Sequence, residues 1–188
     1  MDDLHITGDE AADALLSADP LALLTGMLLD QQVPMETAFA GPAKIRERLG
    51  RFDAAALAGE DPEHLTEVFR VTPAVHRYPG SMAGRVQALA GAVQDEWGGD
   101  ASAIWTRDDP DGAEVLRRLK ALPGFGEQKA RIFLALLGKR GRFSGTGWRE
   151  AAGDYGQDGF RSVADITSPE SLAKVREHKQ AQKAAAKH

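Results

Sequence analysis

The stretch ALPGFGEQKARIFLALLGKRG, from Ala121 to Gly141, places a Pro-Gly-Phe-Gly turn directly before the clearest amphipathic helix of the chain. Apolar residues recur at helical spacing in its second half, and the expected buried stripe is Ala130, Phe133, Leu134 and Leu137. A helix over Gly112–Leu119 is predicted ahead of the turn. The pattern therefore predicts two helices joined by a tight turn, an αα-hairpin.

The turn itself has the features of an anion site. Gly124 and Gly126 can adopt positive φ and place no side chain between the backbone and a ligand. The N–H groups that begin the second helix lack intrahelical acceptors, and the helix dipole adds about half a positive charge there. A phosphate suits such a turn, with Leu122 and Phe125 packed inward to hold it. An ordinary helix corner, in which Gly and Pro are also expected, is the alternative.

The distribution of charge favours the phosphate interpretation. The chain of 188 residues has a net charge of −5, and residues 1–70 hold 14 acids against 5 Lys and Arg. Residues 115–149 hold a single acid, Glu127, against nine cations: Arg117, Arg118, Lys120, Lys129, Arg131, Lys139, Arg140, Arg142 and Arg149. An acidic protein can still present one basic face to nucleic acid. A solvated helix face is the alternative for this local excess of +8.

Composition excludes several other classes of site. The chain has no cysteine, which excludes disulfides, a thiol nucleophile, and Cys-ligated zinc or iron–sulfur clusters. The histidines outside the His76 loop show no metal-ligand spacing, so no metal site is predicted at His5, His64, His178 or His188. No apolar run approaches the roughly 18 residues that span a bilayer, and the first ten residues do not resemble a signal peptide. We expect a soluble cytoplasmic protein.

The chain is predicted to be all-α, because Ala, Leu, Glu, Arg and Gln dominate the segments between Gly and Pro. The predicted helices are Gly8–Ser17, Leu21–Asp30, Met35–Leu49, Asp53–Ala58, Pro62–Arg70, Ser81–Trp97, Ala101–Trp105, Gly112–Leu119, Glu127–Leu137, Trp148–Gly153 and Ser168–Ala185. Starts are expected at Asp19-Pro20, Asp61-Pro62 and Ser168-Pro169, and stops at Gly50, Gly98-Gly99 and Gly138. Residues 1–178 are expected to form one domain, with a mobile tail over 179–188.

The hairpin string resembles that of the HhH-GPD superfamily of DNA glycosylases, which reads Leu-Pro-Gly-Val-Gly-x-x-x-Ala. Two further stretches are similar to the same family in order and approximate spacing: PLALLTGMLLDQQVP (Pro20–Pro34) and HRYPGSMAGRVQALA (His76–Ala90). The resemblance covers residues from about Pro20 to Gly153. It implies two helical lobes with a cleft between them, a hairpin that grips the DNA backbone, and a cleft that receives a flipped base.

The resemblance also assigns DNA-binding roles to individual residues. Gln31 and Gln32 lie where the family inserts a Gln into the gap left by the flipped base; the alternative is a polar helix end. Tyr78 is a candidate for stacking on a base and Arg77 for a phosphate contact, although a satisfied loop around His76 is equally compatible. Trp148 could stack on the extruded base or belong to the core. The hairpin residues expected to contact the strand are Leu122, Gly124, Phe125, Gly126, Gln128, Lys129 and Arg131. The resemblance also allows a monovalent cation on the hairpin carbonyls; no other cofactor is expected.

Two departures from the family concern catalysis. Bifunctional members carry a nucleophilic Lys at the position of Gln128; Lys129 is one residue later, about 100° around the helix, and is expected to face phosphate rather than the cleft. A Schiff-base lyase is therefore not expected. The family's catalytic Asp would align with Thr146, and no acid occurs from Gly141 to Arg149; Glu150 and Asp154 follow too late.

Three explanations for the missing Asp remain open. Asp30 could supply the carboxylate from the opposite side of the cleft, an easily leaving base could need no carboxylate, or the protein could bind damaged DNA without cutting it. The resemblance implies a monofunctional DNA glycosylase of base-excision repair, a monomer that acts on damaged double-stranded DNA and is associated with the nucleoid, with no membrane partner. The alternatives are a non-catalytic protein that recognises lesions or distorted duplex, and a helical interaction protein that keeps the hairpin as a scaffold.

Overall fold

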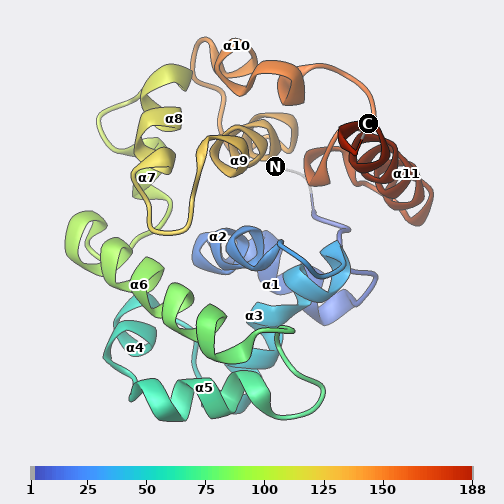
Figure 1. Ribbon diagram of the computed structural model, residues 1–188. Helices are drawn as coiled ribbons and strands as arrows, with labels where there is room; N and C mark the ends of the chain where they lie inside the picture. The colour runs from blue at the N-terminus through green and yellow to red at the C-terminus, as the bar shows by residue number, and fades with distance from the viewer. Residues whose placement is uncertain (1–2, 188) are drawn as a thin grey trace.

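The structure, a computed structural model, describes residues 3–187. Within these residues all regular secondary structure is helical: eleven α-helices and two short 3-10 helices, η1 and η2, with no strand (Figure 1). The prediction of an all-α protein is confirmed.

The helices follow the predicted order with small shifts at their ends. They are α1 (Glu10–Ala18), α2 (Pro20–Leu29), α3 (Met35–Leu49), α4 (Ala54–Gly59), α5 (Pro62–Arg70), α6 (Pro79–Trp97), α7 (Ala103–Thr106), α8 (Gly112–Lys120), α9 (Glu127–Lys139), α10 (Trp148–Ala152), η1 (Gly153–Gly156), η2 (Val163–Asp165) and α11 (Pro169–Ala186). Neither 3-10 helix was predicted as such, because each is a single turn with no hydrophobic period to reveal it.

Local capping explains most of the boundaries. The Asp19 carboxylate accepts hydrogen bonds from the N–H groups of Leu21 and Ala22, and Ser168 forms a capping box with Ser171 at the start of α11. Gly50 and Gly98 end α3 and α6 in the left-handed conformation, as predicted.

The predicted stop at Gly138 is wrong, because α9 continues to Lys139. A Cβ on Gly138 would lie 2.3 Å from a ring carbon of Trp148. Glycine at this position therefore makes room for an indole packed on α9 and does not end the helix.

The helix α2 lies at the centre of the molecule. Nine of its ten residues are buried, which is the pattern of a helix covered on all sides. In Figure 1 it lies between a group formed by α3–α6 and a group formed by α7–α10, and it contacts α3, α6 and α9. Segments far apart in sequence therefore meet at the C-terminal end of α2.

The last helix is attached mainly through its first half. Ser171 and Val175 are its buried residues, and it contacts η2. Residues 179–186, part of the predicted tail, continue this helix, as their Ala, Gln and Lys content favours; their mobility stays a prediction, and position 188 lies outside the described residues.

No single helix among residues 3–187 is long and apolar enough to cross a bilayer. The helices α1 and α2 meet that length and hydropathy requirement only as a pair, which is bent by 116°.

Candidate functional site

The hairpin turn connects α8 to α9 and is held from inside by two apolar side chains. Leu122 and Phe125 are each 4% exposed, and the ring of Phe125 meets that of Phe133 edge-on with centroids 6.1 Å apart. Gly124 has φ +81°, and a Cβ there would lie 2.2 Å from Cδ1 of Leu28 in α2. The turn therefore packs directly against the C-terminal end of α2.

The second hairpin glycine, Gly126, has a different backbone conformation and different surroundings from Gly124. Its φ is −77°, because Gly126 is the extended N-cap of α9, so of the two hairpin glycines only Gly124 uses the positive φ that glycine allows. A Cβ there would meet nothing within 4 Å. Neither backbone conformation nor packing excludes a side chain, yet the residue leaves the first turn of α9 without a side-chain cap. The N–H groups at the start of α9 are thus open to an external acceptor.

Many of the cations around the hairpin are bound within the protein. Arg118 has a side chain 10% exposed and donates to the carbonyls of Ile104 and Arg107. Lys139 forms a buried ion pair with Asp165, 2.7 Å apart. Arg131 donates to the Ala151 carbonyl and pairs with Glu127. The excess charge of +8 over residues 115–149 therefore does not form a continuous basic face. Arg118 and Arg131 are bound to backbone carbonyls, and Lys139 is paired with Asp165, an acid outside this segment.

Asp30 ends α2 and is the buried carboxylate of the candidate site. Its side chain is 8% exposed, and its Oδ2 lies 3.7 Å from Nζ of Lys179 in α11. Burial raises the pKa of Asp30, and the positive charges of Lys179 and Lys129 partly oppose that rise. A carboxylate in this position is held near cations and is largely removed from water.

The side chain of Lys129 turns towards α2, and the expectation that it faces outward to phosphate is wrong. Its Nζ donates to the carbonyl of Leu28 at 2.6 Å, because the last carbonyls of a helix attract a cation. The pKa of Lys129 is lowered to about 8, mainly by burial and to a smaller extent by repulsion from Arg85 and Lys179, while the negative charge of Asp30 opposes the shift. The preceding residue, Gln128, is exposed and donates to the hydroxyl of Tyr155.

These groups form what we call the Asp30 cluster: Asp30, Arg85, Lys129, Lys179 and Lys183, each of which interacts electrostatically with Asp30 or with Lys129. They come from the end of α2 and from α6, α9 and α11. The cluster contains four cations and one acid, so its positive charges are only partly compensated, and such a region attracts anions.

Sequence reasoning missed Arg85, Lys179 and Lys183. The one available signal was the spacing of cations along the last helix, at positions 176, 179, 183 and 187.

The turn after α2 is fixed by hydrogen bonds from other elements. His76 is 1% exposed; its Nε2–H is shared by the carbonyls of Leu29 and Gln31, and its Nδ1 accepts from the N–H of Tyr78. These partners favour the neutral tautomer, and burial lowers the pKa of His76. The interpretation of His76 as a satisfied loop histidine is confirmed.

The two glutamines of this turn have different surroundings. Gln31 donates to the Leu28 carbonyl and accepts from Arg85, each at 3.0 Å. Gln32 is exposed and has φ +58°, a conformation that residues other than glycine adopt rarely and often at functional positions. Of the pair, Gln32 is the side chain that is free to reach a ligand.

The two aromatic candidates, Tyr78 and Trp148, also have different surroundings. Tyr78 is 41% exposed, with the guanidinium of Arg77 5.4 Å from its ring centroid. Trp148 is half-buried against Gly138 of α9, so its indole serves packing as the core interpretation predicts. A flipped base cannot stack on the face that α9 covers.

The other acids considered in place of the family's Asp, Glu150 and Asp154, are exposed. Asp30 is therefore the one buried carboxylate among the three. No group of three or more His, Asp and Glu in residues 3–187 is arranged to hold a metal ion, and His188 lies outside that range.

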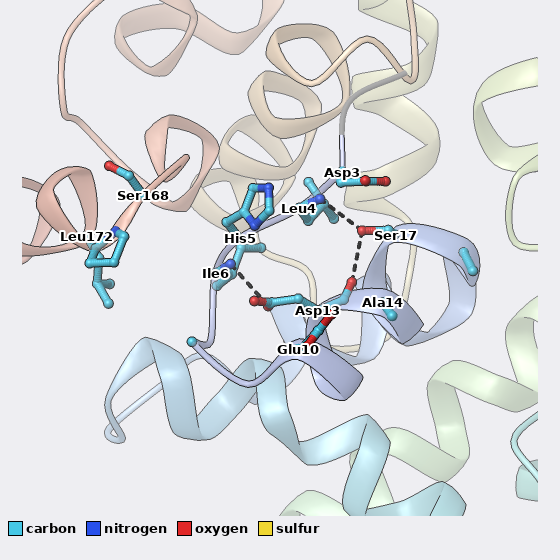
Figure 2. A pocket seen from close by; sticks show the side chains of 13 residues that line it. Asp3, Leu4, His5, Ile6, Glu10, Asp13, Ala14, Ser17, Ser168 and Leu172 are labelled. Carbon is cyan, nitrogen blue, oxygen red and sulfur yellow. Dashed lines mark hydrogen bonds between the residues drawn. The ribbon is translucent and has the colours of Figure 1, made fainter.

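Two cavities, of about 760 and 820 Å³, lie away from this site. One of about 760 Å³ is formed by the N-terminal segment, α1 and the start of α11 (Figure 2). Its buried acid, Asp13, accepts hydrogen bonds from the N–H groups of Ile6 and Thr7, so that carboxylate holds the N-terminal segment in place. The arrangement gives Asp13 a structural role.

The chain matches no family model, and comparison with curated proteins finds no relative. The hairpin and the Asp30 cluster are therefore the features on which a functional proposal rests.

Proposed function

We propose that this protein is a monofunctional DNA glycosylase of the HhH-GPD type, which binds duplex DNA through its hairpin and uses Asp30 to excise a damaged base. One observation carries the proposal: the open glycine turn of the hairpin packs directly against the end of α2 that bears the buried Asp30. A backbone grip and a candidate catalytic carboxylate thus lie side by side.

The hairpin supplies the grip on the strand. The start of α9 has no side-chain cap, and nothing occupies the space beside Gly126, so a phosphate oxygen can approach the N–H groups there. The cations of the Asp30 cluster lie next to this turn, since Lys129 belongs to the first turn of α9. Their uncompensated charge adds to the attraction for a polyanion.

Asp30 supplies the chemistry. As the bond between C1′ and the base nitrogen breaks, positive charge develops on the sugar, and a nearby carboxylate stabilises it most strongly where water is excluded. Water then adds its hydroxyl to C1′, and its proton leaves with the base or the solvent. The exposed Gln128 offers no amine, and Lys129 is hydrogen-bonded to the Leu28 carbonyl, so the expected product is an intact abasic strand.

A second candidate function is lesion recognition without excision. It is favoured by the ion pair that places Lys179 against an Asp30 only 8% exposed. A substrate sugar reaches that carboxylate only if Lys179 moves, and a protein whose Lys179 stays in place would bind damaged duplex without cutting it.

The deciding experiment incubates the protein with duplexes that each carry one alkylated, deaminated or oxidised base, followed by alkaline cleavage of abasic sites. We expect strand breaks only after alkali and no covalent adduct on borohydride treatment. Gly126→Asp should abolish binding, because the new carboxylate caps α9 and repels phosphate, whereas the uncharged Gly126→Asn controls for the capping.

The possible outcomes either favour one of the two candidate functions or contradict both. Failure of the parent protein to bind any duplex at low salt contradicts both candidates. Binding with no excision of any lesion supports lesion recognition, and an adduct trapped by borohydride contradicts the monofunctional mechanism.

A further inference from the structure

The helix α11, together with the residue that caps its C-terminus, carries a stripe of four cations on one face. Arg176, Lys179, Lys183 and Lys187 follow at intervals of three, four and four residues, and at about 100° per residue they stay within roughly a quarter of the helix circumference. We call these residues the α11 stripe. Lys174 lies on the opposite face, with its Nζ 4.6 Å from the ring centroid of Phe160.

The two halves of the stripe differ in their surroundings. Arg176 pairs with Glu36 of α3, and Lys179 pairs with Asp30. Lys183 and Lys187 are exposed, and no acid of residues 3–187 lies within ion-pair distance of either. The buried residues of α11, Ser171 and Val175, are both in its first half. The second half is therefore held to the body by the ion pair of Lys179, and the other two cations of the stripe, Lys183 and Lys187, form no ion pair with an acid among residues 3–187.

We propose that the α11 stripe is a second DNA-backbone contact, which continues the hairpin contact along the phosphates of the same duplex. The inference rests on the proposed function. The stripe is continuous with the hairpin because Lys179 and Lys183 share the Asp30 cluster with Lys129 of α9. Phosphates are a regular row of anions, and the stripe spans about 16 Å at 1.5 Å per residue.

The composition of α11 favours nucleic acid over an anionic membrane. A helix that lies in a membrane interface needs large apolar side chains opposite its cations. Beyond Lys179 the non-basic residues of α11 are Gln180, Ala181, Gln182 and Ala184–Ala186, which bury little apolar area. The stripe therefore has the charge for a polyanion without the apolar face for a bilayer.

The test compares two charge reversals that change the net charge equally. Lys183→Glu lies on the stripe and Lys174→Glu lies on the opposite face; both positions are exposed, and thermal unfolding checks that each variant keeps its fold. Duplex affinity is measured from about 50 to 200 mM salt. We expect Lys183→Glu to lower the salt slope by about one and to weaken binding about tenfold, with Lys174→Glu within about twofold of the parent.

Every other result overturns the inference. Equal weakening by both reversals would mean that only net charge matters. No weakening by Lys183→Glu, in the same assay in which Gly126→Asp abolishes binding, would leave the proposed function standing and remove the stripe from the interface. Binding to phosphatidylserine vesicles but not to duplex by the parent protein would point to a membrane partner, and would contradict the proposed function as well.

Discussion

The hairpin turn packs against the end of α2, close to the turn that follows this helix, but the two turns are built in opposite ways. The hairpin, residues 121–126, is held by its own apolar residues, Leu122 and Phe125, and by a glycine conformation. The turn after α2, residues 30–34, is held by side chains from elsewhere: His76, Arg85, Lys129 and Lys179. The first leaves backbone donors open to a ligand, whereas the second collects charged side chains around a buried acid.

The comparison separates the binding and chemical roles. A turn that supports itself can present its backbone to any phosphate without regard to sequence. A turn assembled from four elements holds one carboxylate in a fixed place, as a reaction requires. Four substitutions test this contrast, and they are given in order of decreasing expected effect.

The largest effect is expected from Asp30→Asn, which keeps the shape of the side chain and removes its charge. Single-turnover excision should slow about 10²–10³-fold, roughly 3–4 kcal/mol of barrier, while duplex binding persists. Because burial raises the pKa of Asp30, excision by the parent should fall on acidification at a higher pH than for an ordinary Asp. Glu150→Gln and Asp154→Asn serve as matched controls, and parental rates in Asp30→Asn would rule out this residue as the catalyst.

His76→Ala should destabilise the fold by about 3 kcal/mol at pH 7, since it removes the donor shared by the carbonyls of Leu29 and Gln31 and the acceptor of the Tyr78 N–H. The lowered pKa of His76 means that the unfolded chain binds more protons than the folded one below about pH 6.5. The parent should therefore lose stability as the pH falls through that window, and its advantage over His76→Ala should narrow.

Urea unfolding at pH 7 and pH 5 measures this difference. His64→Ala, at an exposed histidine paired with Glu60, is the control. An advantage of the parent that is unchanged at pH 5 would argue against a neutral His76 as the support of this turn.

Gly124→Ala should cost about 2–3 kcal/mol, because it forces a side chain into a left-handed conformation and against the buried Leu28. The matched change Gly126→Ser should alter stability by at most about 0.5 kcal/mol, since that position is open and serine is a good N-cap. Denaturant unfolding of the two variants tests whether one hairpin glycine serves the fold and the other the ligand; equal costs would contradict that division.

The smallest effect is expected from Lys129→Met. The lowered pKa of about 8 means that the charged ammonium is disfavoured in the folded protein, and Leu28 keeps a second donor in Gln31. Because solvent screens a partly buried cation, the gain at pH 7 should be only about 1 kcal/mol, or about 2–4 °C in unfolding temperature.

The pH dependence of that gain has a defined sign. Between pH 8 and about 10 the unfolded parent binds more protons than the folded parent, so the parent gains stability as pH rises and the difference from Lys129→Met closes. Thermal unfolding from pH 7 to 10 measures it, and a constant difference would show that Lys129 titrates as an exposed lysine.

The helices and the hairpin were predictable because their signals are local. Asp19-Pro20, Ser168-Pro169 and Gly50 act on the few residues next to them, and the apolar spacing of α9 defines its buried face without any partner. The prediction that the helix stops at Gly138 failed because the cause is not local. Glycine is required there by the indole of Trp148, ten residues later, which no rule based on neighbouring residues includes.

The candidate site was only partly predictable. Asp30 and the hairpin glycines were identified from sequence, but the direction of Lys129 was wrong, and Arg85, Lys179 and Lys183 were not foreseen. The direction of a helical side chain can be inferred from spacing only when the buried face is known, and Lys129 borders that face. Its partner, the Leu28 carbonyl, is 101 residues away.

By itself, then, the sequence determined the all-α class, the order of the helices and a glycine turn whose backbone is open, because capping, periodicity and glycine conformation act within a few residues. Only the tertiary structure decided which cations remain outside internal pairs, which acid is buried, and that α6, α9 and α11 meet at the end of α2. Electrostatic interactions in a folded protein depend on distance in space and on exclusion of water. Neither quantity exists for a residue until the distant parts of the chain have packed around it.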